Sequence, residues 1–436
     1  MRKGMACLLI LSLLLLCGCQ GREPKKGCWE MGFGKATLNL PEQTDAPLYI
    51  AGYHTGWEIE GVRDLQQARA VWLSDGITST VLISVDCIGL GSDTVGQIRD
   101  RLADFCRQTG CDGVQVVATH THAGVDTLGL WGPVGLDGKN PEFMEILIEG
   151  AVQAAKDAYA DRAEGTLSFS KTETQGLQAD SRDPQVFDRN LYQLCFTPKD
   201  AAKNGIRMVS FAAHAEALRG DNRQVSRDFP GLVCDIIEER TGEDALFLPG
   251  AIGGLIMTPV LTEGAFDAEE NLMLTGQALA ETALSAPPGE ELPPQLRFST
   301  VQWETPLENT IFLYYKFLGI LQNEVRQGIN GTYYLQTELS VLQLGDVTVA
   351  MLPGEIFPEL IFELRKTQLG AGQLLVVGLA NDEIGYIVPL SDFRLDAELP
   401  YLQEAEGDHY EETNSVGRNC AADLADAFRQ ALKGLE

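Results

Sequence analysis

Short apolar runs that alternate with amphipathic segments restrict the fold of this chain most strongly. Apolar runs at 68–73 and 80–85 flank Ser74-Asp75-Gly76, a pattern typical of a β-hairpin. The segment 93–110 has apolar residues at helical spacing and ends on a glycine, and 114–118 is again a short apolar strand. Because strands and helices alternate, we predict an α/β fold, a mixed β-sheet core flanked by helices.

The remaining periodic segments continue this alternation, with one interruption. Further helices are predicted at 142–157, 230–239, 271–284, 356–366 and 421–432, and further strands at 191–196, 206–213, 246–248, 297–304, 331–344, 348–351 and 374–379. The proline-rich segment 287–294 indicates either a domain boundary or a surface loop. Candidate site residues lie on both sides of it, so we predict one large domain over 32–436.

The N-terminus has the layout of a secretory signal. Arg2 and Lys3 precede an apolar run, 5–16, that is too short to span a bilayer. The following Leu16-Cys17-Gly18-Cys19 resembles a bacterial lipobox, in which Cys19 would become the lipidated first residue; the alternative is a plain cleaved signal. We therefore predict a lipoprotein signal peptide at 1–18, a tether at 19–31 and an exported protein anchored by acyl chains to the membrane of the bacterial cell envelope.

Charge and cysteine content exclude several classes of protein. The chain has 33 Lys and Arg against 62 Asp and Glu, a formal net charge of −29, whereas binding to nucleic acid needs clustered basic residues. Such a surface is also repelled by anionic lipid, so contact with a membrane requires the anchor. Ten cysteines are too few for a disulfide scaffold of this length, and we predict buried small hydrophobes with one bridge at most.

Two of the five histidines stand where ligand sites are common in α/β proteins. The apolar strand at 114–118 runs into Thr119-His120-Thr121-His122. If the chain stays extended, residues two apart point to the same side, and both imidazoles face one site. Taken alone, the pair is compatible with a metal site and with two hydrogen-bonded structural histidines.

Three further residues extend this candidate site. His214 ends another apolar run, Glu355 follows a strand and Pro353-Gly354 at the start of a predicted helix, and Tyr386 lies in a polar loop after a strand. Each has a structural alternative: a core histidine, a carboxylate that favours a helix N-terminus, and a half-buried aromatic ring. Two strand-end imidazoles with a carboxylate are also what a catalytic zinc site requires.

Taken together, these motifs resemble the neutral/alkaline (non-lysosomal) ceramidases. The motifs at 119–124, 214–222, 353–355 and 381–386 occur in the order of that family, supported by 50–53, 226–231 and 409–411. This resemblance, to short bacterial lipoprotein members, implies a zinc-dependent amidohydrolase that cleaves the N-acyl bond of a sphingolipid. It implies Zn²⁺ as the cofactor, held by His120, His214, Glu355 and Tyr386.

The resemblance also implies catalytic roles for His122, Tyr410 and Arg182. Zinc lowers the pKa of bound water to about 7 and polarises the carbonyl of an amide. Tyr410 or Arg182 would then stabilise the oxyanion, and His122 would carry a proton to the leaving amine.

Departures from the family pattern leave the substrate open. The family serine is absent, with Thr258 the nearest substitute, and Gly254 replaces an expected Asp or Asn. We expect a hydrolase that acts on the amide bond of a small or lipid-like substrate, such as an N-acyl sphingolipid. We expect no nucleic-acid partner. The alternatives are a lipoprotein that binds a ligand without catalysis, or an enzyme that acts on esters or lactones.

Overall fold

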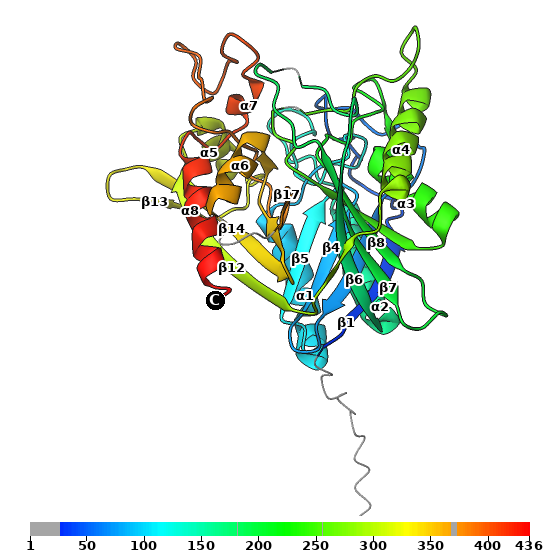
Figure 1. Cartoon of the computed structure of the whole chain (residues 1–436). Coiled ribbons are helices and arrows are strands. Elements are labelled where there is room, and N and C mark those ends of the chain that lie inside the picture. The colour runs from blue at the N-terminus through cyan, green and yellow to red at the C-terminus, as the bar shows by residue number, and fades with distance from the viewer. Residues whose placement is uncertain (1–26, 181, 255, 368–372) are drawn as a thin grey trace, which may run out of the picture.

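The computed structural model describes residues 27–180, 182–254, 256–367 and 373–436 (Figure 1). The predicted signal peptide, Cys19 and most of the predicted tether lie outside the described residues. No helix in the described ranges is long and apolar enough to cross a bilayer.

In the described part of the chain, nine strands form the first of two large sheets. In spatial order they are β10 (Asp244–Pro249), β8 (Ile206–Phe211), β7 (Asn190–Pro198), β6 (Ala163–Glu173), β1 (Trp29–Thr37), β3 (Gln67–Ser74), β4 (Ser79–Val85) and β5 (Gly113–Ala118), with β11 (Glu290–Leu292) on β6. β10 pairs with β8, and β4 with β5, in parallel; the other pairs are antiparallel. The sheet is therefore mixed, as predicted.

The second sheet lies C-terminal to the proline-rich segment. It contains β12 (Leu296–Pro306), β14 (Tyr333–Leu344), β15 (Val347–Met351) and β17 (Gln373–Val377) in that order, with β13 (Val325–Gln327) on β14. Two short parallel pairs join distant segments: β2 (Gly61–Val62) with β9 (Gln224–Val225), and β16 (Glu355–Ile356) with β18 (Tyr386–Ile387).

The two sheets pack face to face. Alternate residues of a strand point to opposite faces, so Val71 and Leu73 of β3 join a core with Leu342 and Val349 of the second sheet. The alternate residue Trp72 instead packs under helices on the outer face. The core between the sheets draws on both sides of the proline-rich segment, which places the two halves of the chain around one hydrophobic interior.

Helices cover the two outer faces (Figure 1). On the first sheet lie α1 (Ser92–Thr109), α2 (Pro141–Asp161), α3 (Asp228–Thr241) and α4 (Ala268–Ser285); on the second lie α6 (Pro358–Thr367) and α8 (Cys420–Lys433). The two remaining helices in the described ranges, α5 (Thr310–Phe317) and α7 (Tyr410–Thr413), are short. The α/β class and the flanking helices are confirmed, with two facing sheets in place of one.

The structure corrects some predicted element bounds. Residues 290–292 of the proline-rich segment form β11, whose Leu292 carbonyl accepts a hydrogen bond from the Trp29 indole, so the segment is not simply a loop. The helix predicted at 356–366 begins at Pro358, because Glu355 and Ile356 pair with β18. Among the described residues no disulfide is present, and Cys87, Cys234 and Cys420 are buried, in line with the expected small hydrophobes.

Candidate metal centre

The carboxyl ends of four strands meet at the candidate site. His120 follows β5 and His214 follows β8, while Glu355 and Tyr386 follow β15 and β17. The first sheet curls so that β10, at one end, lies against β4 and β5 at the other, and Ser84 Oγ donates to the Phe247 carbonyl. This closure brings together strand ends that lie far apart in the order of the sheet.

Three imidazoles converge there. One ligand atom from each of His120, His122 and His214 lies within 4.8 Å of the others. From the sequence we assumed an extended chain at His120. In the structure the backbone there is left-handed instead, with φ 65°. The expected convergence of His120 and His122 is nevertheless present, with ring centroids 4.7 Å apart, because the turn is fixed by backbone contacts such as His122 N–H to the Ala215 carbonyl.

Backbone carbonyls orient two of these rings. Nδ1 of His120 lies 2.6 Å from the Ile88 oxygen, and Nδ1 of His214 lies 2.9 Å from the Ile256 oxygen. A carbonyl oxygen can only accept, so Nδ1 carries a hydrogen in both rings and Nε2 is the nitrogen that faces the cluster. Nε2 of His120 is buried and has no hydrogen-bond partner among the described residues.

Glu355 and Tyr386 add oxygen atoms to the same point. Oε2 of Glu355 lies 2.8 Å from His214 Nε2 and 3.6 Å from His120 Nε2. The Tyr386 hydroxyl lies 3.4 Å from His214 Nε2. The two residues are neighbours in the β16–β18 pair, and Gly354, at φ 76°, makes the turn into it. All four predicted metal ligands are therefore in one cluster.

The charges of this cluster suit a cation. Burial lowers the pKa of His120 to about 3. Burial also acts to lower the pKa of His214, but the hydrogen bond and charge of Glu355 outweigh it and raise that pKa to about 9. Burial opposes ionisation of Glu355, yet its histidine neighbours hold the pKa of the carboxyl low. Imidazole, carboxylate and phenol donors around the unpartnered His120 Nε2 fit a zinc ion.

His122 differs from the other two histidines. Neither ring nitrogen has a hydrogen-bond partner among the described residues. Nδ1 lies 3.7 Å from Oε2 of Glu216, which also accepts a hydrogen bond from the Tyr53 hydroxyl. No carbonyl fixes the hydrogen of His122 on one nitrogen. Burial, aided by the charges of His214 and Arg219, lowers the pKa of His122 well below its usual range, so the ring is neutral and has a nitrogen lone pair that can accept a proton.

Tyr410 and Arg182 occupy different environments. Tyr410 lines the cavity beside the cluster, with its ring centroid 6.3 Å from that of Tyr386. Arg182 is not among the lining residues; it is 3% exposed and forms ion pairs with Glu411, Glu412 and Asp392. The structure thus places Arg182 behind α7 rather than in the cavity.

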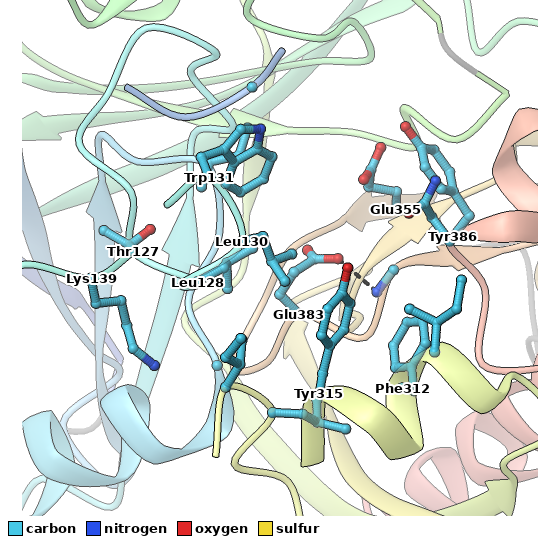
Figure 2. Close-up of a pocket in the computed structure, with 18 of the residues that line it drawn as sticks. Thr127, Leu128, Leu130, Trp131, Lys139, Phe312, Tyr315, Glu355, Glu383 and Tyr386 are labelled. Carbon is cyan, nitrogen blue, oxygen red and sulfur yellow. Dashed lines mark hydrogen bonds between the residues drawn. The ribbon is translucent and has the colours of Figure 1, made fainter. Parts of the chain in front are cut away.

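A cavity of about 320 Å³ opens at the cluster. Its lining includes His120, His122, Glu355 and Tyr386 together with apolar side chains of the 128–131 loop, α5 and the segment after α5: Leu128, Leu130, Trp131, Ile311, Phe312, Ile320 and Leu321. Figure 2 shows Glu355 and Tyr386 together on one side of this cavity. The cavity can hold an apolar chain with one end at the cluster.

Sequence reasoning missed two acidic residues of the site. Glu216 stands two residues after His214, and Glu383 lies in the same loop as Tyr386. Their closeness in sequence to the predicted ligands His214 and Tyr386 was the signal that could have identified both carboxylates. Thr258 and Gly254, the departures from the family pattern, do not line the cavity.

The chain is similar in fold to solved structures of ceramidases. The structure matches that of neutral ceramidase from Pseudomonas aeruginosa with a TM-score of 0.76 at 16% identity, covering 94% of this chain and 75% of that one. A structure described as ceramidase complexed with C2 matches with a TM-score of 0.75 at 15% identity, covering the same shares of the two chains. The shared fold agrees with the motif resemblance.

A curated relative is also similar in sequence. Neutral ceramidase of Mycobacterium tuberculosis is 28% identical over 172 residues, which are 35% of this chain. The match spans only about a quarter, 26%, of the relative's length. No protein-family model matches the chain. The resemblance to the neutral ceramidases that the motifs indicate is confirmed by the fold and by this relative.

Proposed function

We propose that the chain is a zinc-dependent hydrolase that cleaves the amide (N-acyl) bond of a lipid-like substrate. The observation that carries the proposal is the convergence of His120, His214, Glu355 and Tyr386 beside a cavity that several apolar side chains line. The neutral ceramidase name of the relatives favours an N-acyl sphingolipid as the substrate.

These four residues would hold the metal, and the other side chains would act on the substrate. Bound zinc supplies a Lewis acid that polarises a carbonyl and makes water a nucleophile near neutral pH. His122 takes the proton of the attacking water and returns it to the leaving nitrogen, since neither of its ring nitrogens is already engaged. The Tyr410 hydroxyl donates to the oxyanion.

We further propose that the protein is exported and held at the membrane of the cell envelope by a lipid on Cys19. An anchored enzyme would meet substrates that partition into the bilayer. The net charge of −29 argues against adsorption to anionic lipid without such an anchor.

Metal analysis of the purified protein tests the metal assignment. We expect about one zinc per chain, and loss of that zinc in His120→Ala and in His214→Ala, because each variant removes a nitrogen donor. His54→Ala is the matched control, because His54 is exposed and packs against the Trp57 ring outside the cluster. Unchanged zinc content in both ligand variants would show that the assignment is wrong.

Turnover separates the proposed function from its alternatives. Fluorogenic N-acyl amides and the matched esters, assayed with and without a chelator, should show chelator-sensitive cleavage of the amide. Zinc binding without turnover of either substrate would instead favour the ligand-binding alternative. Cleavage of the ester alone would favour the alternative of an enzyme that acts on esters or lactones.

A further inference from the structure

Glu383 is a carboxyl group in the cavity that the proposed reaction does not use. Its Oε1 accepts a hydrogen bond of 2.8 Å from the Gly385 backbone N–H. Its Oε2 is buried and has no hydrogen-bond partner among the described residues. The side chain belongs to the cavity lining, and Figure 2 shows its carboxyl group among the side chains of that lining.

The protein holds this carboxyl group in place without giving it a cation. A Cβ at Gly89 would lie 3.0 Å from Cγ of Glu383 and 3.0 Å from Cδ1 of Leu128, so the stem of Glu383 lies close against the Gly89 backbone. Among the described residues of the lining, Lys139 has the only fixed positive charge, and its ammonium lies 3.6 Å from Asp137. Glu383 itself makes no ion pair in the described ranges.

A buried carboxyl group with a free oxygen is costly unless a ligand completes it. Burial, aided by the negative charge of Glu355, raises the pKa of Glu383 well above its usual range. A cation within hydrogen-bond distance would reverse this effect and favour the ionised form. An acyl chain cannot supply such a partner, but an ammonium group can.

The rest of the lining also favours a cation. It includes the carboxylate of Asp93 as well as the rings of Trp131, Phe312 and Tyr315. Aromatic faces attract ammonium groups electrostatically, and a carboxylate beside such faces is a common way to bind them. The apolar side chains suit an acyl chain, which leaves Glu383 for the amine half of a substrate.

We propose that Glu383 recognises an ammonium group on the amine half of the substrate, a second nitrogen distinct from the one that hydrolysis frees. The substrate class is then an N-acylated diamine. The assignment of this second nitrogen to the amine half of the substrate rests on the proposed function. The binding of an ammonium group at Glu383 is independent of that function.

Binding of short acylated amines tests the proposal, and chelation removes turnover. Calorimetric titration of the purified full-length protein, as isolated and after chelation, would compare the N-acetyl derivatives of 1,4-diaminobutane and 4-amino-1-butanol, of which only the diamine derivative carries an ammonium group. We expect the diamine derivative to bind at least about tenfold more tightly than the amino alcohol derivative, whether or not metal is present. The preference should be lost in Glu383→Gln, which keeps the shape of the side chain but not its charge.

Glu42→Gln is the matched control, since it makes the same substitution at an exposed glutamate outside the cavity lining and should keep the preference. Thermal unfolding shows whether Glu383→Gln folds. If it does not, Glu383→Asp replaces it; this variant moves the carboxylate back by one methylene and should weaken the preference. Equal binding of the diamine derivative and the amino alcohol derivative to the wild type, or an unchanged preference in Glu383→Gln, would overturn the proposal.

Turnover of matched substrates distinguishes this proposal from the proposed function. N-acyl-1,4-diaminobutane should have a higher kcat/KM than N-acyl-4-aminobutanol, with the difference abolished in Glu383→Gln. A Glu383-dependent preference in binding, without hydrolysis of any amide, would reject the hydrolase and retain the ammonium site. Hydrolysis of both amides at equal rates, without a preference in binding, would reject the ammonium site and retain the hydrolase.

Discussion

At the scale of single residues, hydrogen bonding divides the three histidines into two kinds. His120 and His214 each place Nδ1 on a backbone carbonyl, which orients the ring so that Nε2 faces the cluster. His122 has no such acceptor and lies near the Glu216 carboxylate. A metal ligand gains from a fixed tautomer, whereas a proton carrier must change its protonation state, so under the proposed function histidine would serve two purposes in this site.

This difference predicts how His122→Ala behaves. We expect the variant to keep its zinc while kcat falls by roughly 10²–10⁴-fold, because proton transfer to the leaving nitrogen is lost and the metal donors are not. Metal analysis and steady-state kinetics on the same preparation check this, with His54→Ala as control. Parallel loss of zinc and activity would make His122 a ligand.

At the scale of elements, α7 depends on ion pairs made by a distant loop. This four-residue helix brings Tyr410 to the cavity, and its Glu411 and Glu412 are each 1% exposed. Both carboxylates pair with Arg182, at 2.7 Å and 2.9 Å. Four residues are too few for a helix to be stable alone, so the buried ion pairs hold Tyr410 where the substrate would bind.

Arg182→Gln should therefore destabilise the protein. Removing one partner from a buried ion pair costs roughly 3–5 kcal/mol, since the remaining charges stay buried. We expect a clear drop in Tm with unchanged zinc content, measured by calorimetry and metal analysis. Arg418→Gln is the control: the exposed pair of Arg418 with Glu308 is screened by solvent, so its loss should change Tm little.

A different result would restore the role that the family resemblance implies for Arg182. If Arg182→Gln kept the Tm of the wild type and lost only activity, the guanidinium would act on the substrate directly. Arg182→Lys helps to separate the two roles, because it keeps the charge but not the planar fork that engages two carboxylates.

At the scale of the whole molecule, two facing sheets and the curl of the first one create the site. β5 and β8 stand near opposite ends of the sheet order, yet Thr121 and Ala215, just beyond them, form a parallel bridge. The second sheet then delivers Glu355 and Tyr386 from its own strand ends. The cavity thus needs residues from both halves of the chain.

Attachment to the membrane is also a property of the whole molecule. If Cys19 carries the lipid, Cys19→Ser should move the protein from the membrane fraction to the soluble fraction of the expressing cells, because no anchor offsets its negative charge. Fractionation and immunoblotting check this. Cys17→Ser, which leaves Cys19 intact, should stay with the membranes, and a membrane-bound Cys19→Ser variant would rule the lipid anchor out.

Local periodicity determined much of the secondary structure from the sequence alone. Long amphipathic segments such as 93–110 and 271–284 are helices in the structure, with bounds within a few residues of α1 and α4. The pairs β2–β9 and β16–β18 and the helix α7 were not predicted, because partners remote in the sequence stabilise them. The family resemblance indicated His120, His214, Glu355 and Tyr386 as a ligand set, whereas spacing alone left each of them open.

Only the tertiary structure decided how these side chains meet. The left-handed turn at His120, the enclosure of Arg182 by three carboxylates and the unpartnered oxygen of Glu383 all depend on segments far away in the sequence. A sequence records which groups can hold a metal or carry a charge. Whether such a group is buried, and what faces it, follows from packing between elements, and packing in turn sets its protonation and its chemistry.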